Sequence, residues 1–540
     1  MGEGHDCGTA YSWLAGPAHV QLPEFRVKRP PKGRPGSGAV NVYQCVISCI
    51  VFYCICEIRR KVRLDFGDTL MIRNIIGKEI LKNLLSLRFM LSLLLIISLF
   101  ATGGFMFVGK HRQESNDYWR DTNRNLSSLR EHTNHLYELV TFRQVVWRRP
   151  KPLSICAEGF ENTLPDRFSF DPFTWDLPEV RSRSNFLLPH FSDIDWVFTI
   201  SLIVSFVALL LTYDSICGEK RSGTLRLMLA GSIPRHKILL GKYIGAMLTI
   251  GIPLLSGLIV SLIIVVFYRV VEIDTGQCFK ILAIVLLSLL YISIFVLSGI
   301  FISSRSHKPA SSMVVLLLLW VGLVILIPSF GRIIAGTFNK IPARVDMENR
   351  VSEAIKQIRE NIEKFGPGAG SWNSYNDNPP ATAKYYDAQV DARNAIMDEY
   401  LQQMVDQAKT GRYYTCISPA IIYQRASETI AGVGVHRVVD LCRQIKRYQE
   451  SFKEFIRSTD AEDPDSLHLL FQFPSDWVAE NWHAISDKRV DFDSMPKFQE
   501  RDLALGQSLK LAIWDIGLLA LFNLAFFAAS FVSFLRYDVR

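Results

Sequence analysis

The chain has 540 residues, of which 49% are hydrophobic and 21% charged, and its formal net charge is +8. This apolar content excludes an ordinary soluble protein, and this charge content excludes a chain made of membrane spans alone. Because the excess Lys and Arg lie beside apolar runs, they indicate membrane orientation rather than a nucleic-acid partner. We therefore expect a membrane protein with sizeable aqueous parts and no nucleic acid.

Residues 1–70 fit poorly with the rest of the chain. Residues 1–41 are rich in Gly, Pro and basic side chains, which is typical of disorder. The apolar run Val42–Ile58 is short for a membrane span, so it could be a seventh span or a signal-anchor. It could also result from a start codon placed too early, because Met71 opens the stretch MIRNIIGKEILKNLLSLRF. We favour Met71 as the biological start.

Residues 71–88 predict an amphipathic helix in the membrane interface. Its apolar residues repeat at helical spacing: Ile72, Ile75, Ile76, Ile80, Leu84 and Leu87. Such a helix lies in the plane of the interface before the chain enters the bilayer. The alternative is a simple N-terminal extension of the first span.

Six later runs are long and apolar enough to cross a bilayer, which needs about 20 residues in a helix. They are residues 89–109, 196–213, 243–267, 279–302, 310–330 and 511–535. The sequence therefore predicts an all-α polytopic membrane protein with six transmembrane helices.

Lys and Arg in the connections predict how these spans are oriented. Basic residues concentrate before the first run, in the loop 214–242, in the turn that holds Arg305 and Lys308, and after the last run at Arg536 and Arg540. All four regions fall on one side if the six spans alternate, and the positive-inside rule makes that side the cytoplasm. Residues 110–195 and 331–510 are then extracytoplasmic.

The two extracytoplasmic regions differ in pattern. Residues 110–195 show little periodicity, which predicts an irregular loop or small subdomain. Residues 331–510 carry several apolar stripes at helical spacing, which must pack against one another, so we expect a large helical domain between spans five and six. This domain could bind an envelope partner or serve only as a cap. One disulfide could form among Cys156, Cys416 and Cys442, but the sequence does not choose a pair.

No motif in the sequence argues for catalysis. The stretch Gly104–Lys110 matches GxxxxGK, but His111 follows it and it ends an apolar span. A phosphate loop follows a strand and opens a helix in water, so this match is coincidental. We expect no ATP site, cofactor or metal site in this chain, and no enzymatic activity of its own.

Three residues within the spans are candidates for gating. Gly251 and Pro253 lie in the third run, where small residues permit close helix approach and proline favours a kink. Asp515 is a carboxylate near the start of the last run, and intramembrane carboxylates are often functional. The plainer interpretations are an inert helix bundle and an Asp515 that reaches lipid headgroups. The scarcity of polar residues in the spans favours a lipid-like, peptide or other amphipathic cargo over small ions.

The loop between the second and third runs, within YDSICGEKRSGTLRLMLAGSIPRHKILLGKY, resembles the permeases of type-2 ABC exporters. These permeases carry a cytoplasmic segment of the form E-x-x-x-GTL-x-x-L…P-x-R…GK, matched here by Glu219, Gly223, Thr224, Leu225, Leu229, Pro234, Arg235, Gly241 and Lys242. The layout of spans over residues 71–540 also resembles this family. The stretch ISPAIIYQRASETIAG resembles a subgroup labelled as multicopper-enzyme maturation permeases.

The resemblance implies a permease that a separate ABC ATPase drives. Two ATPase copies would bind a pair of permeases, either a homodimer or this chain with a sister permease, in the plasma (inner) membrane of a bacterium. The implied coupling residues are Glu219, Lys220, Arg221, Gly223, Thr224, Leu225, Met228, Pro234 and Arg235. The charged residues would pair with the ATPase, the apolar ones would fill a groove on it, and Gly223 would allow a tight turn. The expected function is export of an unknown cargo; the alternative is an ATPase-driven scaffold that regulates an envelope process without transport.

Overall fold

The computed structural model describes residues 72–159, 164–180, 194–230, 234–330, 343–369, 378–472 and 484–536. The chain divides into two compact units, Met1–Thr69 and Leu70–Arg540. The first unit, with the apolar run Val42–Ile58, lies outside the described residues. The described helices and strands all belong to the second unit.

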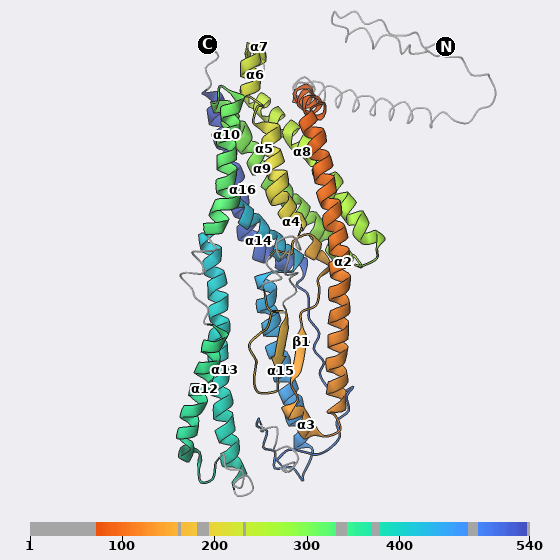
Figure 1. The fold of residues 1–540 in the computed structure, drawn as a ribbon, viewed down its shortest axis with the longest axis vertical. Coiled ribbons are helices and arrows are strands. Elements are labelled where there is room, and N and C mark those ends of the chain that lie inside the picture. Colours follow the sequence, from red (N-terminus) through yellow and green to blue (C-terminus); the bar gives the residue numbers. More distant parts are fainter. Residues whose placement is uncertain are drawn as a thin grey trace, which may run out of the picture. The chain divides into compact units, whose positions relative to one another are not determined.

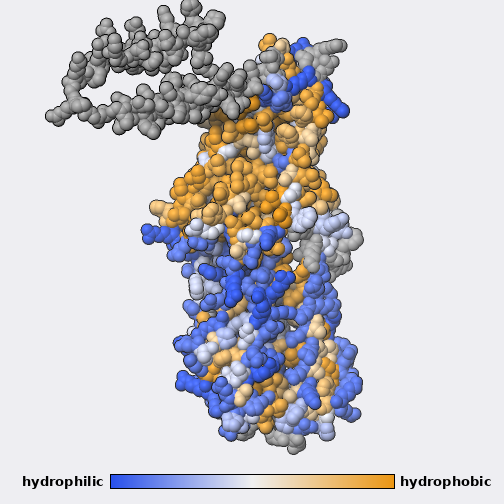
Figure 2. Space-filling view, turned by 180° about the vertical axis from the view of Figure 1, so that it is seen from behind, coloured by the Kyte–Doolittle hydropathy of each residue, from blue (hydrophilic) through white to orange (hydrophobic). Residues whose placement is uncertain are grey.

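Six helices within the described residues are long and apolar enough to cross a membrane, which confirms the predicted all-α polytopic fold. Figure 2 shows apolar side chains gathered around these helices and hydrophilic side chains over the region beside them. In chain order the spans are α2 (Leu87–Glu131), the run of α4, η4, α5 and α6 (Trp196–Ser222), α8 (Arg235–Phe267), α9 (Thr275–Arg305), the run that starts with α10 (Pro309–Phe330) and α16 (Leu505–Leu535).

A separate helix over residues 72–84 precedes the first span. It ends at a turn, after which Ser86 caps α2 by accepting a hydrogen bond from the backbone N–H of Phe89. The helix packs closely on α8, because a Cβ on Gly241 would lie 2.8 Å from Ile75 Cγ2 and one on Gly245 would lie 2.9 Å from Glu79 Cβ. Small residues on α8 therefore admit the helix at short range.

Helix α2 is much longer than the predicted first span. It contains 45 residues and ends at Glu131, not at Gly109. At about 1.5 Å per residue it is roughly 68 Å long, whereas the apolar core of a bilayer is roughly 30 Å thick. Residues 110–131 contain no glycine or proline to stop the helix. The first part of the expected irregular loop is therefore helical.

Two of the spans contain π-helical segments, η4 (Thr199–Val204) and η5 (Val321–Leu326). A π-helix leaves backbone carbonyls without their usual helical donors. Side chains from other helices donate to such carbonyls here: Tyr291 Oη bonds the carbonyl of Ser201 at 2.9 Å, and Ser418 Oγ bonds that of Leu323 at 2.7 Å. These bonds tie the irregular segments into the bundle.

The two predicted extracytoplasmic regions pack together, and we call them the outer domain. The first region supplies α3 (Leu136–Thr141) and an antiparallel hairpin of β1 (Gln144–Trp147) and β2 (Arg167–Phe170). The second supplies α12 (Arg344–Glu360), α13 (Pro379–Tyr414) and α15 (Val435–Ala461). Two apolar cores mix residues of both regions: Leu136 packs with Phe452 in one, and Phe168 with Met397 in the other. Helices predominate in 343–461, as the apolar stripes predicted.

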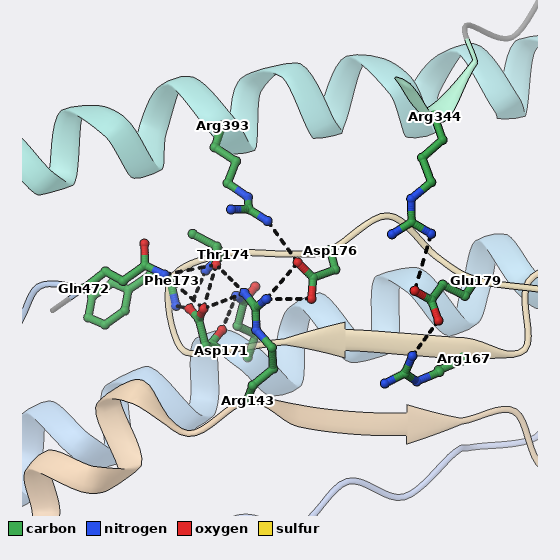
Figure 3. A network of polar contacts seen from close by, with 11 residues as sticks. Arg143, Arg167, Asp171, Phe173, Thr174, Asp176, Glu179, Arg344, Arg393 and Gln472 are labelled. Carbon is green, nitrogen blue, oxygen red and sulfur yellow. Dashed lines mark hydrogen bonds and ion pairs between the residues drawn. The ribbon is translucent and has the colours of Figure 1, made fainter. Parts of the chain in front are cut away.

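Charged side chains link the hairpin to α12 and α13, as Figure 3 shows. Asp176 forms ion pairs with Arg393 on α13 at 2.9 Å and with Arg143 at 2.8 Å. Glu179 lies 3.4 Å from Arg344 at the start of α12. Because most of these side chains are partly exposed, solvent screens the pairs, and they orient α12 and α13 more than they stabilise the fold.

Helix α14 (Pro419–Ala431) departs from the expected outer domain, because it is buried among the spans. It packs against α9 and α16 and shares the apolar core of the membrane helices. Tyr423 is fully buried, stacks on Tyr291 at 4.6 Å between ring centroids, and bonds Ser288 on α9 at 2.8 Å. Small and apolar residues around Tyr423, including Ala420 and Ala426, permit this close packing.

Candidate functional site

The four basic regions identified in the sequence meet at one end of the bundle, which we call the basic end. Arg88 at the start of α2 pairs with Asp214 at 3.2 Å. Lys220 donates to the backbone carbonyls of Ser304 and Ser306 in the turn before α10. Arg235 donates to the carbonyl of Leu535, near the end of α16, at 2.6 Å. These bonds place the four regions at the same end of the bundle. This agrees with the predicted topology, in which two spans separate each region from the next.

The loop 214–242 forms a helical elbow at this end. Helix α6 (Cys217–Ser222) ends at Gly223, and α7 (Thr224–Ala230) follows directly (Figure 1). Gly223 has φ +75°, a left-handed conformation that residues with a Cβ adopt only at a cost. Ser303 Oγ on α9 accepts hydrogen bonds from the backbone N–H groups of Ile216 and Cys217, both at 3.0 Å, which holds the start of the elbow.

A buried cluster of three charges anchors the elbow. Lys242 on α8 is completely buried, and its ammonium group lies 2.9 Å from Glu219 Oε2, donates to Glu79 Oε1, and donates to the carbonyl of Ser215 at 3.0 Å. We call Glu79, Glu219 and Lys242 the Lys242 cluster. It joins the helix 72–84, the elbow and α8. A buried lysine is stable only with such partners, because an isolated buried charge is very costly.

The structure divides the predicted coupling residues into buried and exposed groups. Glu219 is paired internally and Leu225 is fully buried in the apolar core, so neither faces outward as we expected. Arg221 and Pro234 are exposed, whereas Lys220, Gly223, Thr224, Met228 and Arg235 are partly buried. The reason is that α6 packs against α9, Glu219 pairs with Lys242 on α8, and Leu225 joins the apolar core of the bundle.

Two features of the site were not predicted from the sequence: the pairing of Glu79 with Lys242, and the exposure of Leu227 beside its more buried neighbours. Leu227 is the most exposed apolar side chain of the elbow, at 76%. Two signals were present in the sequence: Glu79 is an acidic residue within a basic amphipathic helix, and Lys242 lies where an apolar run begins. A charge in such a position calls for a buried partner.

The candidates for gating lie in different surroundings. A Cβ on Gly251 would meet no described atom within 4 Å, whereas one on Gly257 would lie 2.5 Å from Phe100 Cδ2, so close packing of α8 on α2 depends on Gly257 instead. Pro253 is buried inside α8. Asp515 is 2% exposed and accepts from Arg425 Nη2 of α14 at 2.9 Å. Asp515 therefore pairs with a protein side chain, unlike the interpretation that it reaches headgroups.

Another buried charge cluster lies in the outer domain. Glu500 accepts from Arg437 on α15 at 2.9 Å, and Lys151 lies at the same distance. Burial raises the pKa of Glu500, but the nearby charges of Arg437 and Lys151 outweigh burial and hold the pKa at about 2. The cluster thus stays ionised and joins three segments of the domain.

The three cysteines considered for a disulfide are free thiols in the structure. Cys156 is buried, and burial raises its pKa. Burial also raises the pKa of the Cys442 thiol to about 12, so this thiol stays protonated near neutral pH. Neither thiol is therefore poised for reaction.

The fold and this site define a multi-pass membrane protein whose basic loop is anchored among its spans. The chain belongs to the family described as ABC-2 family transporter protein, whose family model matches residues 73–539. It is thus a transmembrane permease subunit of the ABC transporter class.

One curated relative supports the same class. The chain is 42% identical over 57 residues to the "Probable ABC transporter permease protein NosY" of Stutzerimonas stutzeri. The aligned stretch covers 11% of this chain and 21% of that protein. The chain thus matches about a fifth of the length of this relative.

Proposed function

We propose that this permease uses the elbow α6–α7 to receive force from a separate ABC ATPase and drives export of a cargo across the membrane. The observation that carries the proposal is the elbow itself, which is anchored at its base and exposed at its tip. Glu219 fixes the base to Lys242, while Arg226 and Leu227 on α7 are exposed. An exposed Leu beside arginines is suited to a protein groove with acidic residues at its rim.

The Lys242 cluster makes the elbow a lever. A displacement of α6 would move Glu219, and the ion pairs would pass the movement to α8 and, through Glu79, to the helix 72–84. Packed elements joined in this way move as rigid bodies more readily than they deform. ATP-driven closure of two ATPase subunits would thus rock the spans of a permease pair, formed by two copies or by this chain with a sister permease. The ATPase subunits would supply the ATP site, and this chain would need no cofactor.

Helix α14 would have to move for a path to open at the end of the bundle opposite the elbow. Its contacts with α9, α16 and η5 fill space between the spans. Opening an outward path between these spans would require α14 to shift, with loss of the Arg425–Asp515 pair. The scarcity of polar residues in the spans favours a lipid-like, peptide or other amphipathic cargo.

A scaffold that regulates an envelope process without transport is the second candidate. The outer domain favours it, because two apolar cores and a buried charge cluster among its described residues make a packed platform for an envelope partner. Cargo flux into sealed vesicles distinguishes the two candidates. With a scaffold, the ATPase would hydrolyse ATP but no cargo would accumulate in the vesicles. The subgroup of multicopper-enzyme maturation permeases and a bacterial inner-membrane location are further parts of our proposal.

Leu227→Asp tests the docking function of the elbow. The change should weaken association with the ATPase by roughly tenfold to a hundredfold, because a buried Leu contributes about 1.5–3 kcal/mol and a carboxylate would repel an acidic groove. Co-purification of the ATPase with tagged permease, and stimulation of its ATP hydrolysis, measure the effect. Leu227→Met is the matched control, since it keeps apolar volume. Normal association of Leu227→Asp would show that docking occurs elsewhere.

A further inference from the structure

A cation-lined groove lies at the basic end beside the elbow. It has a volume of about 580 Å³ and is bordered by Lys220, Arg221, Arg226, His307, Lys308, Pro309 and Ala310. These residues come from α6, from α7, and from the turn and first residues of α10. The walls are held together where the Lys220 ammonium donates to the carbonyls of Ser304 and Ser306. The groove is thus a feature of the folded loop and not of one flexible side chain.

The positive charge of this groove is not neutralised by its lining. No acidic residue borders it within the part of the chain that the structure describes, and the neighbouring acids of the elbow are already paired, Asp214 with Arg88 and Glu219 with Lys242. Among the described residues, no carboxylate lies within ion-pair distance of Arg221, Arg226 or Lys308. Several like charges around one hollow repel one another and favour an anion between them.

The position of the groove points to the membrane as the source of that anion. Pro309 and Ala310 begin α10, whose exposed apolar side chains continue from the groove along the span: Val314, Val315 and Leu318. The run Pro309–Phe330 is the least buried of the six spans. The basic groove therefore lies where the apolar surface of α10 starts, which is the depth of lipid headgroups.

The start of α10 adds to the attraction for an anion. The cap residue of α10 is Lys308, whose ammonium group has no acceptor and therefore cannot cap the first N–H groups of the helix. The positive end of the helix dipole lies at the same place. The N-terminus of α10 and the cations of the groove therefore both attract an anion to the same place.

We propose that this groove binds the headgroup of an anionic phospholipid from the leaflet at the basic end, with the phosphate among the cations and the acyl chains along α10. A lipid fits better than an acidic protein segment, because the groove continues into a membrane-facing apolar surface. The bound lipid joins the elbow to span five, so it stabilises the elbow in the position that the structure shows. This binding is independent of the ATPase and of the docking function of Leu227.

The test uses the full-length permease in detergent without any ATPase. Binding of phosphatidylglycerol is compared with binding of phosphatidylethanolamine by native mass spectrometry, and inorganic phosphate is added as a competitor. Arg221→Gln/Arg226→Gln should lower the affinity for phosphatidylglycerol by about tenfold or more, since each basic residue near anionic lipid contributes measurably. Arg73→Gln/Lys82→Gln is the matched control, because it removes two exposed charges from the helix 72–84 at the same end.

Selective loss in the groove variant, with phosphatidylethanolamine unchanged, supports the proposal. An equal loss in both double variants would overturn it, because general attraction to a basic surface would then suffice. Full displacement by inorganic phosphate would also overturn it, since the groove would then be a phosphate site. Unchanged binding of phosphatidylglycerol by the groove variant would likewise reject the proposal. If a separate co-purification of the ATPase with that variant then fails, the groove is a contact for the ATPase instead. Leu227→Asp should leave lipid binding intact, so failure of this proposal and failure of docking are distinguishable.

Discussion

Lys242→Met should destabilise the permease by about 3–5 kcal/mol, because it leaves Glu79 and Glu219 buried without the cation that both carboxylates contact. Two adjacent buried carboxylates repel each other and lack solvation. The elbow should separate from α8 and from the helix 72–84. Thermal unfolding in detergent and the ATP hydrolysis of the complex measure the two effects, and we expect loss of stimulated hydrolysis even at temperatures where the variant stays folded.

The triple variant Glu79→Met/Glu219→Met/Lys242→Met provides the control for this prediction. Apolar residues of similar volume often replace a buried ion cluster without loss of stability, so the triple variant should recover most of the unfolding temperature. It should recover less of the coupling if ion pairs transmit the movement of α6. A Lys242→Met variant with native stability would contradict the buried cluster.

Arg425→Met should cost a similar amount, about 3–5 kcal/mol, because it removes the guanidinium that lies 2.9 Å from the buried Asp515 carboxylate. The effect should concentrate on α14, whose polar attachment to α16 is lost. Thermal unfolding measures the stability, and proteolysis near residues 419–431 reports whether α14 has left the bundle.

Arg425→Met/Asp515→Leu removes both charges and should restore stability while weakening the link between α14 and α16. If α14 must move during transport, this double variant should leak cargo or hydrolyse ATP with poorer coupling. A single Arg425→Met variant that unfolds like the native protein would show that water already solvates Asp515.

The spans and the basic loop could be predicted from the sequence, because both depend on local composition. An apolar run of about 20 residues needs no knowledge of its neighbours to be a span. The same is true of the left-handed turn at Gly223, which needs only a residue without Cβ. The assignment of Glu219 and Leu225 to an outer surface failed to anticipate their burial, because that depends on how short helices cover α8 and α9.

Long-range pairs could not be predicted in this way. Lys242 and Glu79 are 163 residues apart, and Arg425 and Asp515 are 90 residues apart. Ser418 caps the start of α14 through a local hydrogen bond, but the burial of this helix follows from Tyr423 and small neighbours that fit against α9. Local periodicity predicts that a helix has an apolar face, and does not predict which other helix covers it.

Site-specific photo-crosslinking tests the central claim, that the elbow is where the ATPase acts on this permease. A photoreactive amino acid would replace Leu227 on α7, or Val345 in the outer domain, both exposed apolar positions at 76% and 63%. In membranes that contain the full complex, we predict an adduct with the ATPase from position 227 and none from position 345. An ATPase adduct from position 345, or no ATPase adduct from position 227 in an active complex, would contradict docking of the ATPase on the elbow.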